Sequence, residues 1–306
     1  MYNYPKLKKD ISNTGIGVLE LSDTIKDNIR ESFNTHSLKE LITKYGTLFL
    51  NTNSGNIDEG TGPPLPWPYK NDYEYDSTII PKIKEKILEI NKTMEGKDIT
   101  YVATEHNSET GREENMESPL YDFFGPYEKL TILRKYIVDN FKSSVFQMWY
   151  DIPLQNIINP SGVDVTKIHQ ELTKIYLELY GHLEEVENFG REYNPNESIQ
   201  QTFRIQVYEE GCHIESHQDG GGGHCAMLVY TNEDYVEGKG GELVSEYKPG
   251  RNKDVETITV PPTIGTLAIV DFKKDPLHAV NVVKEPNWMR TVIGCWWPPG
   301  NIYNLS

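Results

Sequence analysis

Cysteines are scarce in this sequence, and they do not form a recognisable framework. Only three occur in 306 residues, at Cys212, Cys225 and Cys295, an odd number at spacings unlike those of zinc ligands. Free thiols fit a reducing compartment better than a secreted disulfide scaffold does. We therefore expect a cytoplasmic protein whose fold needs no covalent cross-links.

Long apolar runs and basic blocks are missing as well. The N-terminus has no apolar signal-peptide core, and no uninterrupted apolar stretch approaches the length of a membrane span. The net charge is -16, and no block of Lys and Arg offsets it. Such a surface repels phosphate backbones. The sequence therefore predicts no membrane and no nucleic-acid partner, and leaves the oligomeric state open.

The pattern of apolar residues changes near residue 190, and helical periodicity dominates before that point. Apolar residues recur at helical spacing in 77–90 and, most clearly, in 165–190, which stops near Gly190. Between the first helices, the polar and proline-rich stretch 51–76 cannot be a regular helix or a central strand. It is either an ordered lid or a surface loop that covers the sheet.

From residue 202 onward, short turn-bounded segments show the alternation of β-strands. They are residues 202–208, 212–219, 224–231, 241–247, 256–262, 265–271, 278–283 and 290–297. Eight short strands in about a hundred residues predict a sandwich, jelly roll or small barrel. The predicted fold class is α+β, with a mainly helical N-terminal region at 1–200 and a β-rich catalytic core at 201–306 that together form one integrated domain.

Metal-binding side chains gather on one face of the second predicted strand. Alternation puts His217 and Asp219 on the same side, as two ligands of one ion must be. His278 begins a later strand, far enough along the chain to cross a barrel and return. Two imidazoles and one carboxylate leave positions open, which suits Fe(II) that binds both a cosubstrate and dioxygen. We expect these three residues to form the catalytic metal site.

Several motifs taken together resemble a known family. The stretches YEEGCHIESHQD, GKGGELVSEY, VPPTIGTLAIVDFKKDPLHAVNVV and RTVIGCWW follow, in order and at similar spacing, the core of the Fe(II)- and 2-oxoglutarate-dependent oxygenases, and most resemble the prolyl 4-hydroxylase-like branch. The resemblance covers about residues 202–298. It implies a double-stranded β-helix of the cupin-like jelly-roll type, iron held by His217, Asp219 and His278, and 2-oxoglutarate and O2 as cosubstrates.

The resemblance also implies which residues anchor 2-oxoglutarate. Arg290, twelve residues past His278, would grip the distal carboxylate, as a guanidinium can with two parallel hydrogen bonds. Lys284 is the weaker candidate, because it lies only six residues past His278. Tyr208 matches the family tyrosine that hydrogen-bonds the same carboxylate, or is simply a barrel-lining ring. Many relatives have a hydroxyl residue where this chain has Val292, so anchoring should depend more on Tyr208 or on another strand.

Arg204 and Gln206 alternate along the same strand with Tyr208, so all three share the cavity face if Tyr208 lies there. A buried Arg204 needs an anion. The anion is either the carboxylate of a small substrate or an internal acid such as Glu215 or Glu242. On the first alternative, Arg204 and Gln206 bind the substrate.

The predicted enzyme is a 2-oxoglutarate-dependent dioxygenase, an oxidoreductase of amino acid metabolism or biosynthesis. The resemblance implies that 2-oxoglutarate is decarboxylated to succinate while an unactivated C–H bond of a small, carboxylate-bearing, amino-acid-like substrate is oxidised. Hydroxylation is the default outcome, with desaturation or oxidative cyclisation as variants. Two alternatives are a peptidyl-prolyl hydroxylase-type enzyme and a non-oxygenase, cupin-like metal-binding protein, which would need no arginine placed for a dicarboxylate.

The glycine run Gly220 to Gly223 is not a phosphate-binding loop, because no Gly-Lys-Ser/Thr follows it. It is either a flexible turn beside the iron or a plain wide hairpin. His224, which follows, either points back toward the site or caps the next strand.

Overall fold

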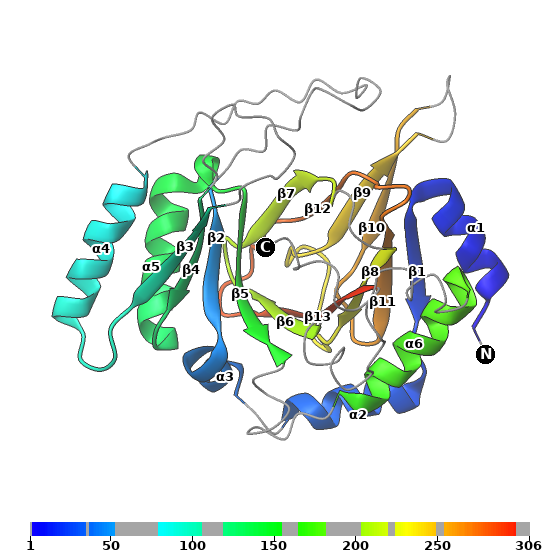
Figure 1. Cartoon of the computed structure of the whole chain (residues 1–306), viewed down its shortest axis with the longest axis horizontal. Coiled ribbons are helices and arrows are strands. Elements are labelled where there is room, and N and C mark those ends of the chain that lie inside the picture. The colour runs from blue at the N-terminus through cyan, green and yellow to red at the C-terminus, as the bar shows by residue number, and fades with distance from the viewer. Residues whose placement is uncertain are drawn as a thin grey trace.

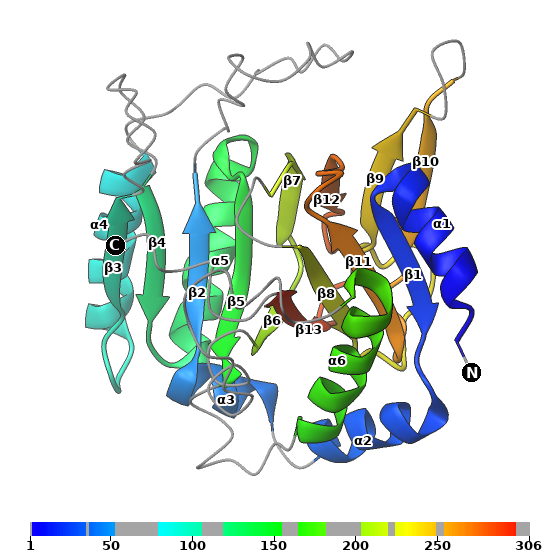
Figure 2. The same ribbon diagram turned by 45° about the vertical axis from the view of Figure 1, so that its right-hand side comes forward.

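The computed structural model describes residues 2–34, 37–52, 79–105, 119–154, 165–181, 203–219, 224–248 and 254–297. Figures 1 and 2 show a barrel of strands with helices around it and a further group of strands at one side. From residue 53 onward, the predicted lid lies outside the described residues, as do Gly220 to Gly223. None of the described helices combines the length and the apolar composition that crossing a bilayer requires.

Eight C-terminal strands form two interleaved sets of four. They are β6 (Phe203–Tyr208), β7 (His213–His217), β8 (Cys225–Tyr230), β9 (Leu243–Tyr247), β10 (Glu256–Val260), β11 (Thr266–Asp271), β12 (His278–Val280) and β13 (Arg290–Trp297). One set has the order β11-β8-β13-β6 and the other β7-β12-β9-β10, and every neighbouring pair is antiparallel. The chain crosses between the sets after every strand except β9, which is the connectivity of a double-stranded β-helix. The eight predicted strands and the predicted jelly-roll fold are confirmed.

The N-terminal region contributes five more strands, β1 (Ile16–Glu20), β2 (Thr47–Asn51), β3 (Thr100–Glu105), β4 (Pro119–Phe124) and β5 (Gln147–Pro153). β1 extends the barrel beyond β11, whereas β5 pairs with both β6 and β7 and so joins the two sets. β2, β4 and β3 continue the sheet outward from β5. The sequence analysis did not predict these strands, because short alternating runs are hard to recognise among strongly periodic helices.

Six α-helices lie in the described part of the chain: α1 (Tyr4–Thr14), α2 (Asp23–Asn34), α3 (Leu38–Tyr45), α4 (Ile79–Thr93), α5 (Tyr127–Phe141) and α6 (Thr166–Tyr180). In Figure 1, α4 and α5 cover the group of N-terminal strands, and α1, α2 and α6 lie at the opposite side near β1 and β11. The helix predicted at 77–90 corresponds to α4. The helix predicted at 165–190 corresponds to α6, which ends at Tyr180, where Gly181 has a φ of 86° and an N–H that donates to Leu177 O; the rest of the predicted helix, 182–190, lies outside the described residues.

Alternation divides the barrel strands between a core face and an interior face. On β6, Phe203 lies against the α6 side chain His169, with ring centroids 5.5 Å apart, so this face of the strand packs on the helices. Tyr208, on the other face, lies against Arg290. The apolar face of the sheet is therefore buried under helices, and the opposite face is left for polar chemistry.

Candidate active site

The structure brings the three predicted metal ligands together. Nε2 of His217 lies 3.3 Å from Oδ1 of Asp219, and Nε2 of His278 lies 3.5 Å from Oδ2 of the same carboxylate. One ligand atom from each residue lies within 4.8 Å of the other two. Strand register is the cause, because β12 pairs His278 directly with His217 of β7. The three side chains could hold one metal ion.

Backbone carbonyls orient both imidazole rings. Nδ1 of His217 lies 2.9 Å from Glu215 O, and Nδ1 of His278 lies 2.9 Å from Pro276 O. Because a carbonyl oxygen can only accept, each Nδ1 carries the proton, and each Nε2 lone pair is free for a metal. Two imidazole nitrogens and a carboxylate oxygen suit Fe(II) with open positions. The residues therefore fit the predicted ion.

The three groups also shift one another's pKa. Burial alone would raise the pKa of Asp219, but its contacts with the two histidines lower it overall. Burial and the neighbouring His217 lower the pKa of His278. Burial alone would lower the pKa of His217, but the contact with Asp219 outweighs it and raises that pKa. An ionised carboxylate beside a neutral imidazole is what metal binding needs.

Arg290 is buried in the barrel with unused hydrogen-bond donors. It is 1% exposed, and its guanidinium carbon lies 4.3 Å from the ring centroid of Tyr208 and 5.2 Å from that of Tyr230. Among the described residues, Nε and Nη1 of Arg290 and the hydroxyl of Tyr230 find no hydrogen-bond partner. Buried donors without an acceptor are costly. A carboxylate bound here would satisfy these atoms, so the cluster fits 2-oxoglutarate.

Gly241 makes room for the arginine side chain. Its φ is 78°, and a Cβ at this position would lie only 2.7 Å from Cδ of Arg290, so any larger residue would be strained and would crowd the guanidinium. Lys284, the other cation considered from the sequence, is exposed. Arg290 is therefore the buried cation of the two.

Tyr230 is a site residue that the sequence analysis missed. It pairs with Val292 across β8 and β13, next to the position where relatives have a hydroxyl residue on the strand of the arginine. Burial raises the pKa of Tyr208 and of Tyr230, so both hydroxyls keep their protons and can donate. Alternation alone could have placed Tyr230 on one face of its strand, but only the pairing of distant strands puts it beside Arg290.

The predicted substrate residues Arg204 and Gln206 lie on the Tyr208 side of β6. The side-chain carbonyl of Gln206 accepts a hydrogen bond from the Tyr208 hydroxyl at 3.2 Å. Arg204 is paired with an internal acid, because its Nη1 lies 2.8 Å from Oδ2 of Asp151 on β5. This acid is neither of the two glutamates considered from the sequence. The role of Arg204 and Gln206 in substrate binding stays a prediction.

Asp151 is a buried carboxylate in an unusual electrostatic setting. Burial raises its pKa to about 6, with the attraction of Arg204 opposing the shift and Asp122 adding to it. Asp122, on β4, accepts a hydrogen bond from Thr47 at 3.0 Å. In the strand register, Asp151 lies opposite Gln206 on one side and Thr47 on the other. The interior face of the barrel thus continues onto β5 and β2 with charges of both signs.

Aromatic rings follow the same face outward from Arg290. The indole of Trp149 on β5 lies 5.9 Å from the Tyr208 ring, and it stacks on Phe49 of β2 with centroids 4.3 Å apart. These rings lie on the same sheet face as the Asp151–Arg204 pair.

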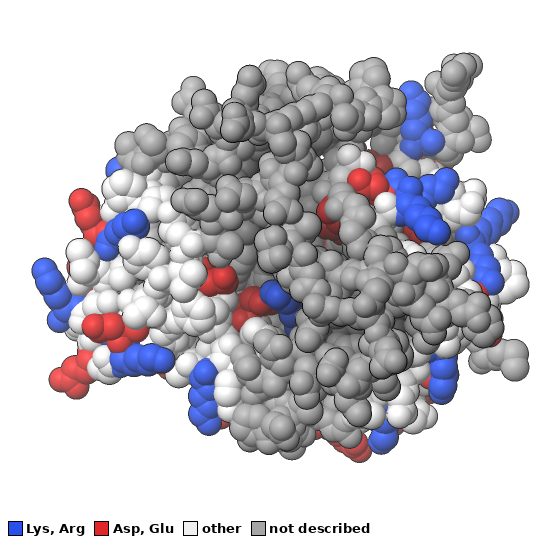
Figure 3. All heavy atoms as spheres, viewed as in Figure 1, with Lys and Arg blue, Asp and Glu red and all other residues white. Residues whose placement is uncertain are grey.

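Figure 3 shows acidic and basic side chains intermixed along the edge of the face seen in Figure 1.

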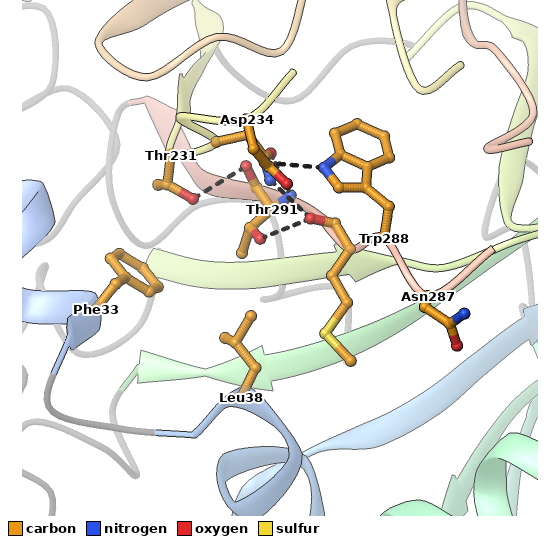
Figure 4. Close-up of a pocket in the computed structure, with 9 residues that line it drawn as sticks. Phe33, Leu38, Thr231, Asp234, Asn287, Trp288 and Thr291 are labelled. Atoms are coloured by element: carbon orange, nitrogen blue, oxygen red, sulfur yellow. Dashed lines mark hydrogen bonds between the residues drawn. The ribbon is translucent and has the colours of Figure 1, made fainter. Parts of the chain in front are cut away.

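A pocket of about 340 Å³ (Figure 4) includes Thr291 of β13, which alternates with Arg290 and so lies on the other face of that strand. It is lined by Phe33, Leu38, Thr231, Asn232, Asp234, Asn287, Trp288, Met289 and Thr291. Its polar groups bond one another: Trp288 Nε1 donates to Asp234 at 3.0 Å, and Asn232 both donates to Met289 O at 2.7 Å and accepts from Thr291 N at 2.8 Å. These three polar side chains therefore already have partners within the pocket.

The site combines two histidines and a carboxylate in one cluster of a jelly roll with a buried arginine that has unsatisfied donors. This combination is typical of the non-haem iron oxygenases that use an acidic cosubstrate. Residues 203–298 match the model of the 2OG-Fe(II) oxygenase superfamily. The family resemblance is thereby confirmed, and this third of the chain is a 2-oxoglutarate-dependent dioxygenase domain, which uses Fe(II), 2-oxoglutarate and O2.

Solved structures of prolyl hydroxylases are similar to the whole chain at low identity. A prolyl-4-hydroxylase of Pseudomonas putida is 11% identical, with 96% of this chain and 97% of that chain covered and a TM-score of 0.40. A prolyl hydroxylase of Trichoplax adhaerens, solved with a hypoxia inducible factor peptide, is 11% identical, with 96% and 87% covered and a TM-score of 0.38. Among curated proteins, none matches the sequence. At these values, the likeness carries no conclusion about the substrate.

Proposed function

We propose that this protein oxidises a C–H bond of a small amino-acid-like substrate at an iron held by His217, Asp219 and His278. The observation that carries the proposal is the convergence of their ligand atoms within 4.8 Å. When bound, Fe(II) supplies the centre at which 2-oxoglutarate and dioxygen react, with succinate and carbon dioxide as coproducts. The chain's own residues bind and orient the reactants.

Three residues would anchor 2-oxoglutarate. The two unsatisfied nitrogens of Arg290 would donate to the distal carboxylate, because a guanidinium presents parallel donors that match a carboxylate. The hydroxyl of Tyr230, which lacks a partner among the described residues, would donate to the same group. The Tyr208 hydroxyl already donates to Gln206, so Tyr208 would support the guanidinium through its ring. Tyr230 would thus replace the hydroxyl that Val292 lacks.

The substrate would lie over the sheet face beside this anchor, where Arg204 and Asp151 present opposite charges. The Arg204 side chain is 31% exposed although it is paired, so its guanidinium can still meet a carboxylate, while Asp151 and Asp122 favour an ammonium group. Gln206 connects this pair to Tyr208. Holding both charges of an amino acid would fix which C–H bond faces the iron, and such positioning is a large part of catalysis.

A panel of free L-amino acids and short prolyl peptides tests the substrate class. Each compound is incubated with enzyme, Fe(II), 2-oxoglutarate and O2, and both succinate and oxidised product are measured. We expect one product per succinate with a free amino acid and no product with the peptides. Coupled turnover of peptides alone would overturn the proposed substrate class and leave the oxygenase assignment intact.

Arg204→Met separates substrate binding from cosubstrate binding. The variant retains Arg290 and should still form succinate, but we expect it to form severalfold less product per succinate, because the substrate is held loosely. Lys284→Met removes an exposed cation outside the cluster and is the matched control. Equal coupling in Arg204→Met and the control would show that Arg204 only neutralises Asp151.

A further inference from the structure

We propose that helix α6 positions the metal site from outside the barrel, with Tyr180 and Tyr176 as positioning residues. The Tyr180 hydroxyl holds the chain segment that leads to His278, and the Tyr176 hydroxyl bonds His224, which contacts the same segment. This inference rests on the proposed iron site and extends it to a helix that carries no metal ligand. Figures 1 and 2 both show α6 beside the barrel strands, near β11.

Tyr180 acts on the turn that precedes His278. Its hydroxyl donates to Oδ2 of Asp271 at 2.9 Å, and Asp271 is the last residue of β11 and is buried. The other carboxylate oxygen accepts from Lys274 N at 2.9 Å. Each carboxylate oxygen thus has one donor, one from the helix and one from the turn. Loss of the Tyr180 hydroxyl would leave a buried oxygen without its donor, which is costly.

The same turn is bonded to both ligand-bearing segments. Asp275 N donates to Asp271 O at 2.9 Å, and Asp275 O accepts from the side-chain amide of Gln218 at 2.6 Å. Gln218 lies between the ligands His217 and Asp219. One residue further along the turn, Pro276 O accepts from Nδ1 of the third ligand. The turn therefore sets where the two segments lie relative to each other.

The turn has a conformation that needs such support. Asp275 has a φ of 43°, in the left-handed region that residues with a side chain seldom adopt. Conformations of this kind persist where the surrounding contacts over-determine them. The hydrogen bonds of Asp275 with Asp271 and Gln218 stabilise this conformation, and the Tyr180 hydroxyl holds the Asp271 side chain in place.

Tyr176 supports the same turn through His224. Its hydroxyl lies 2.7 Å from Nδ1 of His224, which follows Asp219 by five residues. The rings of Tyr176 and His224 are nearly parallel, with an interplanar angle of 18° and centroids 5.9 Å apart. His224 O also accepts from Phe272 N at 2.9 Å. His224 is thereby bonded both to α6 and to the turn that Tyr180 holds. This contact with α6 is a role for His224 that the sequence analysis did not consider, and the two alternatives given there stay open.

The test is metal binding by the metal-free protein, measured by anaerobic titration with Fe(II) and, separately, by the visible absorption of bound Co(II), which reports ligand geometry. We expect Tyr180→Phe to bind Fe(II) about tenfold more weakly, at the low end of the loss seen when an outer partner of a metal ligand is removed. The Co(II) spectrum should change shape as well. Tyr176→Phe should shift both readouts in the same direction by a smaller factor.

Tyr2→Phe is the matched control, because the Tyr2 hydroxyl also bonds α6, donating to Glu171 at 2.8 Å, but does not contact the turn. Fe(II) affinity and Co(II) spectra of Tyr180→Phe equal to those of Tyr2→Phe would overturn the inference while leaving the iron site standing. Failure of the unaltered protein to bind Fe(II) would overturn the proposed function and this inference together. Tyr180→Phe could also lower the melting temperature of the metal-free protein. In that case Tyr176→Phe, which leaves Asp271 paired, is the deciding variant: weaker Fe(II) binding than in Tyr2→Phe supports the inference, and equal binding overturns it.

Discussion

The barrel and the N-terminal region contribute to the site in different ways. The barrel supplies His217, His278 and Arg290, side chains whose positions follow from strand register and from bonds to nearby carbonyls or close packing. The N-terminal region supplies groups that contact barrel residues, such as Asp151 against Arg204 and Tyr180 against Asp271. We infer that the barrel defines the reaction, and that the N-terminal region governs what is oxidised and how firmly the metal is held.

Removal of a metal ligand should have the largest effect. His217→Ala, Asp219→Ala and His278→Ala should each reduce succinate formation by at least about 100-fold, more than the loss typical of an outer partner. The fold should survive, because these side chains lie outside the apolar core. Turnover and circular dichroism are measured together. Turnover equal to that of the unaltered protein in any one variant would remove that residue from the metal site.

Arg290→Lys tests the cosubstrate anchor within the barrel. A point charge would replace a fork of parallel donors, so the 2-oxoglutarate concentration needed for half-maximal turnover should rise by about tenfold or more, with little change in the Fe(II) requirement. Titration of each component at a saturating level of the other gives both numbers. Equal weakening for Fe(II) and 2-oxoglutarate would indicate that Arg290 only supports the barrel.

Tyr230→Phe should have a smaller effect of the same kind. Loss of one hydrogen bond, worth roughly 0.5–1.5 kcal/mol, corresponds to an increase of about two- to tenfold in the 2-oxoglutarate requirement. The ring remains to pack against the guanidinium, so stability should hold. Tyr235→Phe, a change at a tyrosine whose hydroxyl donates to Glu242, is the control. A shift in the control as large as in Tyr230→Phe would contradict the assignment.

His213 lies where the barrel meets the N-terminal region. Its substitution should give the smallest effect, a change in how the free energy of unfolding depends on pH. Its Nδ1 and Nε2 lie 2.9 Å from Gly211 O and 3.1 Å from Val145 O. Both nitrogens must donate, so the folded state favours the protonated ring. Burial alone would lower the pKa of His213, but its bonds to Glu215 and to these carbonyls raise it overall.

A raised pKa stabilises the fold below the unfolded value of about 6.5, and this stabilisation is lost as pH rises through the folded value. The free energy of unfolding of the unaltered protein should therefore exceed that of His213→Gln most clearly near pH 5.5, and the difference should shrink toward pH 8. Denaturant titrations at several pH values measure it. A difference that grows with pH would contradict a protonated His213.

The barrel was predictable because its chemistry and its alternation are local. His217 and Asp219 lie two residues apart on one strand, and each of the eight strands carries its own turn signals. The roles of Tyr230 and Asp151 could not be predicted, because they depend on which distant strand lies beside each residue. The pairing of β5 with β6, which brings Asp151 to Arg204, has no local signature. The domain division and the 51–76 lid stay predictions.

The most direct test of the central claim is an anaerobic titration of the metal-free protein with Fe(II) and 2-oxoglutarate, followed by visible absorption. If the three ligands hold iron and Arg290 holds the cosubstrate beside it, a weak charge-transfer band should appear only when both are present, and it should be lost in Asp219→Ala. No band with both components present would contradict the account.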